Sequence, residues 1–151
     1  MIQVRHLTKV YPDGTRALDD VSVDIQDGEF VSIIGLSGAG KSTFLRCLNG
    51  LVQPTQGSIK IDGQEVAGAS EHTLRLVRKK MGFIFQQFNL VTRLNVLQNV
   101  LTGRLGYRST HSGLLGLFAV SDRQIALDYI QRVGLAEKVF TRASHLSGGQ
   151  Q

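Results

Sequence analysis

The chain has 151 residues, of which 42% are hydrophobic and 19% charged, a composition that predicts one compact globular domain rather than a disordered chain or a coiled coil. No apolar run reaches the roughly 18–20 residues of a membrane span, and residues 1–6 lack the layout of a secretory signal. The single cysteine, Cys47, excludes an internal disulfide and fits a reducing cytoplasm. The net charge of +5 comes from scattered basic residues without interleaved aromatic residues, so we expect no nucleic-acid partner.

The first half of the chain shows the patterns of strands, tight turns and helices. A nearly continuous apolar run over 30–34 predicts a strand buried on both faces. Turns are predicted at Pro12-Asp13-Gly14 and Asp62-Gly63. Cys47 falls at helical spacing with apolar neighbours, which makes it a core residue, and Gly50 is placed to end its helix. The remaining predicted strands cover 2–4, 21–25, 59–61 and 81–85, and the predicted helices cover 41–49 and 71–80.

The second half is predicted to be mainly helical, with helices over 94–101 and 122–133. Ser121 is the expected N-cap of the second helix and Gly134 its expected terminator. Its expected apolar face consists of Ile125, Leu127, Ile130 and Val133. Residues 103–120 lack clean periodicity, so we expect a loop or short helical insertion that is a candidate partner contact.

The most informative motif is the segment Gly35-Leu36-Ser37-Gly38-Ala39-Gly40-Lys41-Ser42-Thr43. It fits the P-loop pattern and lies between an apolar run and a predicted helix start, which is the context that this motif needs. Its glycines let backbone N–H groups turn inward around phosphates. In this pattern Lys41 supplies a cation for the β- and γ-phosphates, and Ser42 supplies a hydroxyl ligand for Mg²⁺. The chain is therefore predicted to bind a nucleoside triphosphate through Gly35, Ser37, Gly38, Gly40, Lys41, Ser42 and Thr43.

The last residues carry a second candidate site, Leu146-Ser147-Gly148-Gly149-Gln150. A serine and two glycines at a turn before a helix could offer a hydroxyl and N–H groups to an anion. A polar helix cap explains the same residues equally well.

The LSGGQ sequence at 146–150 and the P-loop at 35–43 resemble the motifs of ABC-transporter ATPases. The resemblance implies an α/β P-loop fold with an N-terminal antiparallel β subdomain and a helical subdomain. It divides the chain into a P-loop core over 1–80 and a part over 81–151 that holds the Q-loop, the helices and the signature motif. Tyr11 matches the aromatic residue on which these ATPases stack adenine. Gln86, with Gln87 as the adjacent competitor, matches the Q-loop glutamine that approaches Mg²⁺ and the attacking water.

The residues from 85 to 101, followed by Gly103-Arg104-Leu105-Gly106, are similar to the ATP-binding subunit of bacterial phosphonate importers. This resemblance implies a peripheral subunit on the cytoplasmic face of the inner membrane, with ATP and Mg²⁺ as ligands. Its implied partners are a second ATPase subunit arranged head to tail, transmembrane permease subunits and, indirectly, a substrate-binding protein. In such a dimer, the P-loop of one copy faces Ser147, Gly148, Gly149 and Gln150 of the other. An importer of another oxyanion or of amino acids, and a non-transport ABC ATPase, are the alternatives.

The resemblance also identifies what the 151 residues do not contain. The family's signature is followed by an apolar strand ending in Asp-Glu and later by a switch histidine, and neither is present. His6, His72, His111 and His145 all precede the signature and show no metal-ligand spacing. We therefore expect the N-terminal portion of an ATPase, lacking the C-terminal half of the core, with hydrolysis reduced by roughly 10²–10⁴ through loss of the general base. The run at 30–34 is then expected at an open apolar edge, and the alternative function is nucleotide binding without hydrolysis.

Overall fold

The computed structural model describes residues 1–107 and 118–151. The described chain divides into two compact units, Met1–Phe83 and Ile84–Gln151, and the predicted domain organisation stays a prediction. No helix in the described part of the chain is both long and apolar enough to span a bilayer.

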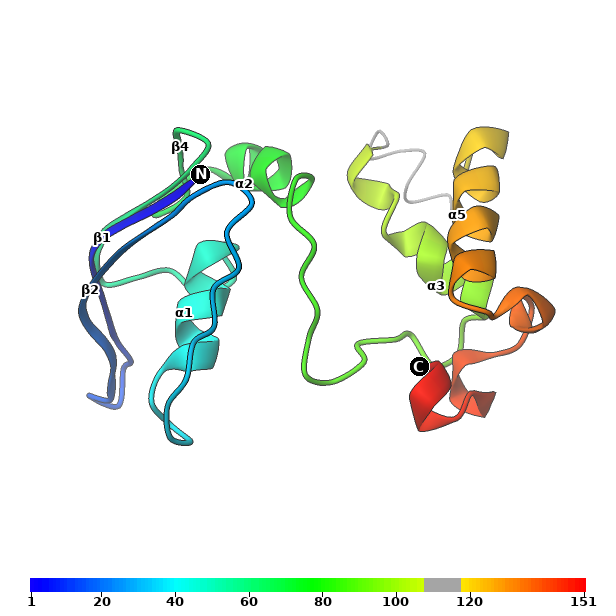
Figure 1. Ribbon diagram of the computed structural model, residues 1–151, viewed down its shortest axis with the longest axis horizontal. Helices are drawn as coiled ribbons and strands as arrows, with labels where there is room; N and C mark the ends of the chain where they lie inside the picture. The colour runs from blue at the N-terminus through cyan, green and yellow to red at the C-terminus, as the bar shows by residue number, and fades with distance from the viewer. Residues whose placement is uncertain (108–117) are drawn as a thin grey trace. The chain divides into compact units, whose positions relative to one another are not determined.

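The first unit is built on a four-stranded antiparallel sheet in the order β2-β1-β3-β4 (Figure 1). Its strands are β1 (Ile2–Val10), β2 (Arg16–Ile25), β3 (Gln56–Ile61) and β4 (Gln64–Glu65). The turn between β3 and β4 consists of Asp62 and Gly63, with φ of 49° and 77°. Positive φ at both central residues gives the turn a twist that matches the paired strands, which explains the predicted Asp-Gly signal.

Helices α1 (Lys41–Leu48) and α2 (Glu71–Arg78) complete the core of the first unit. Cys47 on α1 is fully buried, as predicted, and this burial raises the pKa of its thiol. The two helices are connected by Arg78, which donates hydrogen bonds to the carbonyl oxygens of Asn49 (2.9 Å) and Gly50 (3.0 Å). Gly50 has a φ of 68° and follows the C-cap of α1, so it ends this helix as expected. The P-loop helix is thus fixed at its C-terminal end by α2.

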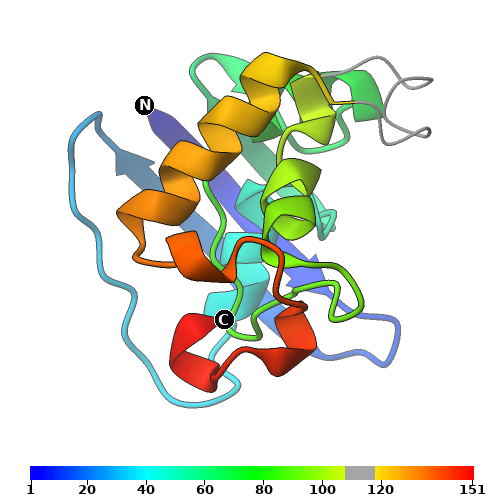
Figure 2. The ribbon, with the colours of Figure 1, turned by 90° about the vertical axis from the view of Figure 1, so that its right-hand side faces the viewer.

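The second unit is a small helical assembly. Its long helices α3 (Val96–Thr102) and α5 (Val120–Arg132) lie side by side (Figure 2). Val96, Ile130 and Leu146 form its buried apolar cluster. Short 3-10 helices complete the unit: η1 (Leu105–Tyr107), η2 (Ala136–Lys138), η3 (Ala143–His145) and η4 (Gly148–Gln150).

Helix α5 differs from its prediction at its start and in its buried face. Ala119 is the N-cap, so Ser121 lies inside the first turn and the predicted cap is wrong. The buried residues are Asp122, Ala126 and Ile130, whereas Leu127 and Val133 are exposed. An ion pair explains the rotation of the face, because Arg104 Nε donates to Asp122 Oδ1 at 2.8 Å and makes the burial of this carboxylate possible.

The segment over 103–120 contains η1, and its residues 108–117 lie outside the described part of the chain. The prediction of a loop or helical insertion can therefore be compared with the structure over 103–107 and 118–120.

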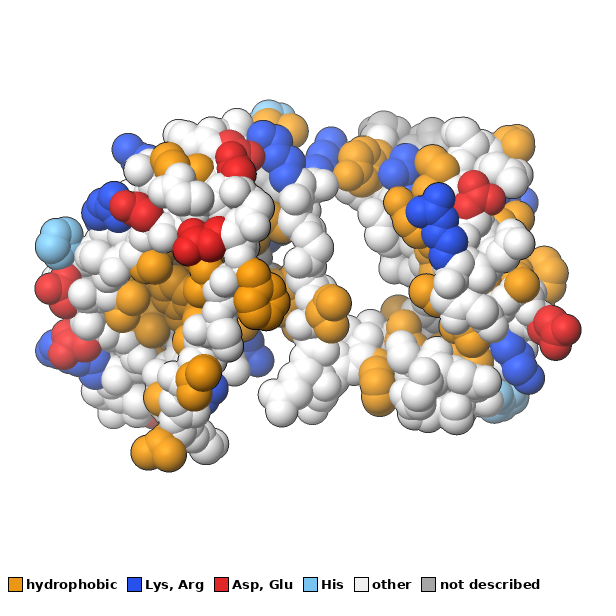
Figure 3. Space-filling model, in the orientation of Figure 1, with side chains coloured by type: hydrophobic (Ala, Val, Ile, Leu, Met, Phe, Trp, Pro, Cys, Tyr) orange, Lys and Arg blue, Asp and Glu red, His pale blue; other side chains and the backbone are white. Residues whose placement is uncertain are grey.

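Residues 30–34 do not form the predicted strand. Among the described residues no strand pairs with this segment, so its backbone lacks the ladder that a strand requires. Phe30 and Ile34 are exposed by 93% and 90%, which agrees with the expected open apolar segment. An apolar hollow of about 270 Å³ lies between β2, residues 31–34 and α1. Figure 3 shows hydrophobic side chains gathered in the open middle of the first unit.

Residues 81–85 also form no strand, contrary to the prediction. Here too, the described sheet places no neighbouring strand beside the segment. The side chains of residues 81–84 alternate in exposure, as in a strand. A strand also needs a neighbouring strand that pairs with its N–H and C=O groups, and the local sequence does not supply one.

Candidate functional site

The P-loop connects the extended segment at 30–34 to the start of α1. Gly38 and Gly40 both have a φ of 82°, the left-handed conformation that side chains rarely adopt. Gly40 also lies against β2, where a Cβ atom would come within 2.1 Å of the Ala17 carbonyl oxygen. The sequence therefore needs glycine at position 40 for both backbone conformation and close packing.

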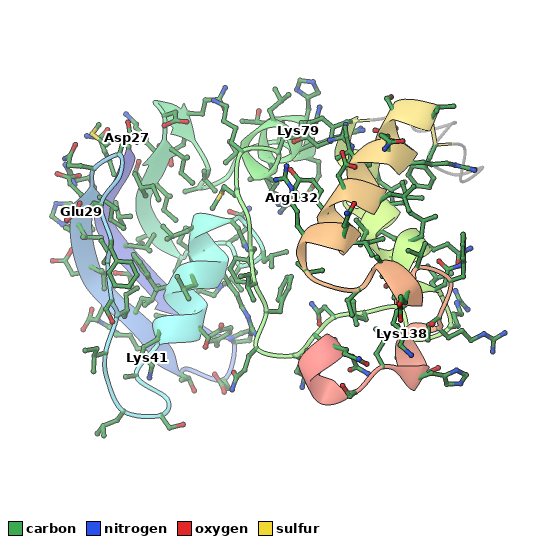
Figure 4. The ribbon with its side chains drawn as sticks, turned by 45° about the vertical axis from the view of Figure 1, so that its right-hand side comes forward. Asp27, Glu29, Lys41, Lys79, Arg132 and Lys138 are labelled. Carbon is green, nitrogen blue, oxygen red and sulfur yellow. The ribbon has the colours of Figure 1, made fainter. Side chains whose placement is uncertain are left out.

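Lys41 lies at the first position of α1, where the loop joins the lower end of the helix in Figure 4. Its Nζ donates to the carbonyl oxygens of Gly35 (2.8 Å) and Leu36 (2.7 Å), so the side chain folds back across the loop. These carbonyl contacts hold the ammonium group over the loop. A phosphate oxygen entering the loop would replace them with a charge-assisted hydrogen bond.

The start of α1 fits the phosphate groups of a nucleotide. Its first N–H groups have no acceptors within the helix, and its dipole favours an anion at this end. Gly38 has no atom within 4 Å of an added Cβ position, so the loop is open beside it. The first turn contains no acidic residue that would repel phosphate. The exposed Ser42 hydroxyl follows Lys41 directly.

The residues around the start of α1 fit Mg²⁺ only together with phosphate. In the described part of the chain, no three His, Cys, Asp or Glu side chains are grouped to hold a metal ion. Mg²⁺ commonly uses one or two protein oxygens together with substrate phosphates and water. Ser42 can supply one such oxygen when a nucleotide is bound.

The structure brings Tyr11 to the P-loop helix. The Tyr11 hydroxyl lies 3.3 Å from Thr43 Oγ1. Tyr11 follows β1 in a tight turn, with its N–H donating to the Thr15 carbonyl oxygen (2.9 Å) and its own carbonyl accepting from Gly14 N–H (2.9 Å). In the same turn, the Thr15 N–H donates to Asp13 Oδ1 at 3.0 Å, and this hydrogen bond lowers the pKa of the Asp13 carboxyl. A residue far from the P-loop in sequence therefore lies beside it.

Gln86 lies in the second unit and is exposed, as is its competitor Gln87. The geometry of the described residues does not distinguish the two amides. The role of Gln86 toward Mg²⁺ and water, and its joint action with Ser42, stay predictions.

The signature residues form the 3-10 helix η4, with Ser147 as its N-cap. The Ser147 N–H donates to Gln150 Oε1 at 3.1 Å, so the polar cap that was one of the two interpretations is present. Gln151 Nε2 donates to the carbonyl oxygens of Ala143 and Leu146, both at 3.1 Å, and fixes this turn to its own unit. Ser147, Gly148 and Gly149 are all exposed. Their service as a second phosphate-binding surface stays a prediction.

Sequence reasoning missed two residues beside the P-loop and Tyr11. The carbonyl group of Ala17 fixes Gly40, and nothing in the sequence marks this contact. Lys9 Nζ lies 5.2 Å from the centroid of the Tyr11 ring. The spacing of Lys9 and Tyr11, two positions apart where β1 ends, was the feature of the sequence that could have indicated this contact.

A family model described as ABC transporter matches residues 18–151. Two curated relatives are phosphonates import ATP-binding proteins PhnC, one from Halalkalibacterium halodurans (52% identical) and one from Lactobacillus johnsonii (50% identical), both over the whole chain. The chain spans 62% and 59% of their respective lengths.

A solved structure described as a dimeric bacterial ABC transporter cassette, MJ0796, matches 99% of the chain with a TM-score of 0.85 and 36% identity, and the match covers 65% of that structure. A second MJ0796 structure, described as bound to ADP and Pi, gives a TM-score of 0.84 at 35% identity, with 99% of this chain and 65% of that one covered.

Proposed function

Because the chain belongs to the ABC transporter family, we propose that it is the ATP-binding, energy-coupling part of a bacterial importer. The observation that carries the proposal is the P-loop at the start of α1, with Lys41 held across the loop and Tyr11 beside Thr43. This arrangement offers a phosphate site and an aromatic ring within one unit, as an adenine nucleotide requires.

In this proposal, the chain's own residues bind and orient the nucleotide. Lys41 leaves the carbonyl oxygens of Gly35 and Leu36 and pairs with the β- and γ-phosphates. The N–H groups of the first turn of α1 donate to phosphate oxygens. Tyr11 presents its ring to adenine. The Ser42 hydroxyl would help to hold Mg²⁺ together with the phosphates, and the ion would supply neutralisation of the charge that develops during phosphoryl transfer.

Hydrolysis and transport belong to the complete protein in this proposal. Two copies face each other head to tail, so that Ser147, Gly148, Gly149 and Gln150 of one copy close on the nucleotide of the other. The similar MJ0796 structures, which are described as dimeric, support the assembly of two copies. Gln86 links the nucleotide to permease subunits, and the subunit lies at the cytoplasmic face of the inner membrane without contacting nucleic acid.

Phosphonates are the proposed cargo, received by the permease from a substrate-binding protein. The support is the identity of about half to the phosphonate-importer relatives over all 151 residues. Deleting the gene of the complete protein should abolish growth on a phosphonate as sole phosphorus source. Growth that persists, together with lost uptake of another oxyanion or an amino acid, would assign the cargo differently.

The nucleotide site itself is tested by calorimetric titration of the chain with MgATP. Lys41→Ala should weaken binding about tenfold to a hundredfold, because a charge-assisted hydrogen bond to phosphate is lost. Lys60→Met serves as the control, since Lys60 is an exposed lysine on β3 opposite Gln3, at the far end of β1 from Tyr11. Equal affinity of the wild type and Lys41→Ala would refute the proposed site.

A further inference from the structure

The ring of Tyr11 has a cation on one of its faces. Lys9 Nζ lies 5.2 Å from the ring centroid, inside the roughly 6 Å range in which a cation interacts favourably with an aromatic face. Lys9 is the next-to-last residue of β1 and Tyr11 is the first residue after the strand, so the two are only two positions apart in the chain.

The ammonium group is itself held in place. Lys9 Nζ donates to the carbonyl oxygen of Gln53 at 2.7 Å. The chain beside Gln53 is fixed to the same end of β1, because Thr55 N–H donates to the Thr8 carbonyl oxygen (2.8 Å) and Val10 N–H donates to Thr55 Oγ1 (3.0 Å). The position of the cation is therefore set by the backbone and does not depend on a flexible side chain alone.

The Tyr11 ring is restrained from a second direction. Its hydroxyl lies 3.3 Å from Thr43 Oγ1 on α1, so one contact fixes the tip of the ring and the other fixes a face. With Lys9 on one face, a stacking partner is directed to the opposite face. A ring that is oriented before binding loses less conformational freedom when the ligand arrives.

We propose that Lys9 is a positioning residue for base recognition, which holds Tyr11 with one face covered and the other presented to the purine of the nucleotide. This inference rests on the proposed function, because it assumes that Tyr11 stacks on the base. Lys9 acts through Tyr11 and makes no contact with the phosphates. It therefore contributes to the affinity for ATP and nothing to the affinity for a triphosphate without a base.

The test is calorimetric titration of the 151-residue chain with MgATP and with magnesium tripolyphosphate. Lys9→Met, which keeps the length of the side chain and removes its charge, should weaken ATP binding about twofold to fivefold. Its affinity for tripolyphosphate should equal that of the wild type. Lys9→Arg, which keeps a cation over the ring, should restore ATP binding, and Lys60→Met should change neither affinity.

A double-mutant cycle separates positioning from general stability. Tyr11→Ala should weaken ATP binding by about fivefold or more through the loss of stacking. Lys9→Met should then have no additional effect, because its action passes through the missing ring.

Three results would overturn the inference: equal losses for both ligands, no change for either, or an undiminished effect of Lys9→Met in the Tyr11→Ala background. Wild-type chain that binds neither ligand would overturn the proposed function itself. Wild-type binding of both ligands with an inert Lys9 would leave the proposed function standing and reject the role of Lys9 alone.

Discussion

Gly40 lies against Ala17, so closely that a Cβ atom on the glycine would come within 2.1 Å of the alanine carbonyl oxygen. The contact joins the P-loop to β2 and leaves no space for any side chain at position 40. Gly38 has the same φ of 82° but has no atom within 4 Å of its Cβ position. The two glycines therefore separate the effect of backbone conformation from that of packing.

Alanine at these two glycines should have unequal effects on the free energy of unfolding. Gly38→Ala should destabilise the first unit by about 1 kcal/mol, the cost of a side chain in the left-handed region. Gly40→Ala should destabilise it by about 3 kcal/mol or more, because a collision with backbone is added. Urea unfolding of both variants measures the difference. Equal losses would show that Gly40 and Ala17 are not in contact.

The ion pair between Arg104 and Asp122 should be important for the second unit. The Asp122 side chain is only 6% exposed, so Arg104→Met removes a cation from a buried carboxylate. We expect a destabilisation of about 2 kcal/mol, below the range for fully buried pairs because Arg104 is 30% exposed. Thermal unfolding followed by circular dichroism measures the loss.

The double variant Arg104→Met with Asp122→Leu is the control for this pair. Replacing both residues removes the buried carboxylate together with its cation, so much of the lost stability should return. A double variant that is less stable than Arg104→Met would contradict the interpretation.

The turn that holds Tyr11 should respond to acid through Asp13. The hydrogen bond from Thr15 N–H lowers the pKa of the Asp13 carboxyl in the folded chain. A lowered folded pKa stabilises the folded state above the unfolded pKa of about 3.9, and this stabilisation is lost as the pH falls through the folded value. NMR titration of the Asp13 carboxyl should give a midpoint below the ordinary value, and Thr15→Pro, which removes the donor, should raise it. A midpoint that is the same in both chains would argue against the turn.

The exposed apolar segment at 30–34 should cause self-association without adding stability. Phe30→Ser and Ile34→Thr replace side chains exposed by 93% and 90%, so each should change the free energy of unfolding by less than about 0.5 kcal/mol. Both should reduce light scattering in concentrated solution.

Val4→Thr provides the contrast, because Val4 on β1 is fully buried in the core of the first unit. It should destabilise the first unit by about 1–2 kcal/mol with no decrease in scattering. Destabilisation of similar size by Ile34→Thr would show that this segment packs in solution.

The sequence predicted those features whose causes are local. The P-loop glycines, the Asp62-Gly63 turn and the end of α1 at Gly50 each depend on backbone conformation over a few residues. The strands predicted at 30–34 and 81–85 are absent because an apolar run specifies no partner, and a strand exists only in a ladder. The face of α5 was assigned wrongly because Asp122 is buried by an arginine 18 residues earlier, which no helical pattern reveals.

The candidate site also combines features with local causes, which were predicted, and features that depend on distant residues, which were not. Its expected phosphate-binding residues are contiguous and form a recognisable motif. Tyr11 entered the site through the family resemblance rather than through spacing, and its contact with Thr43 was not predicted. Lys9 was missed because its significance arises only when β1, the Gln53 carbonyl and the aromatic ring are assembled.

The burial of Cys47 makes the P-loop helix observable in solution. This thiol is the chain's single cysteine, and it is fully enclosed on α1. A thiol reagent can reach it only when the helix separates from its neighbours, so the labelling rate depends on how often the helix opens. A ligand bound at the N-terminal end of α1 would slow the labelling in proportion to its occupancy. The labelling rate of one natural side chain therefore reports ligand binding at α1, and no engineered cysteine is needed.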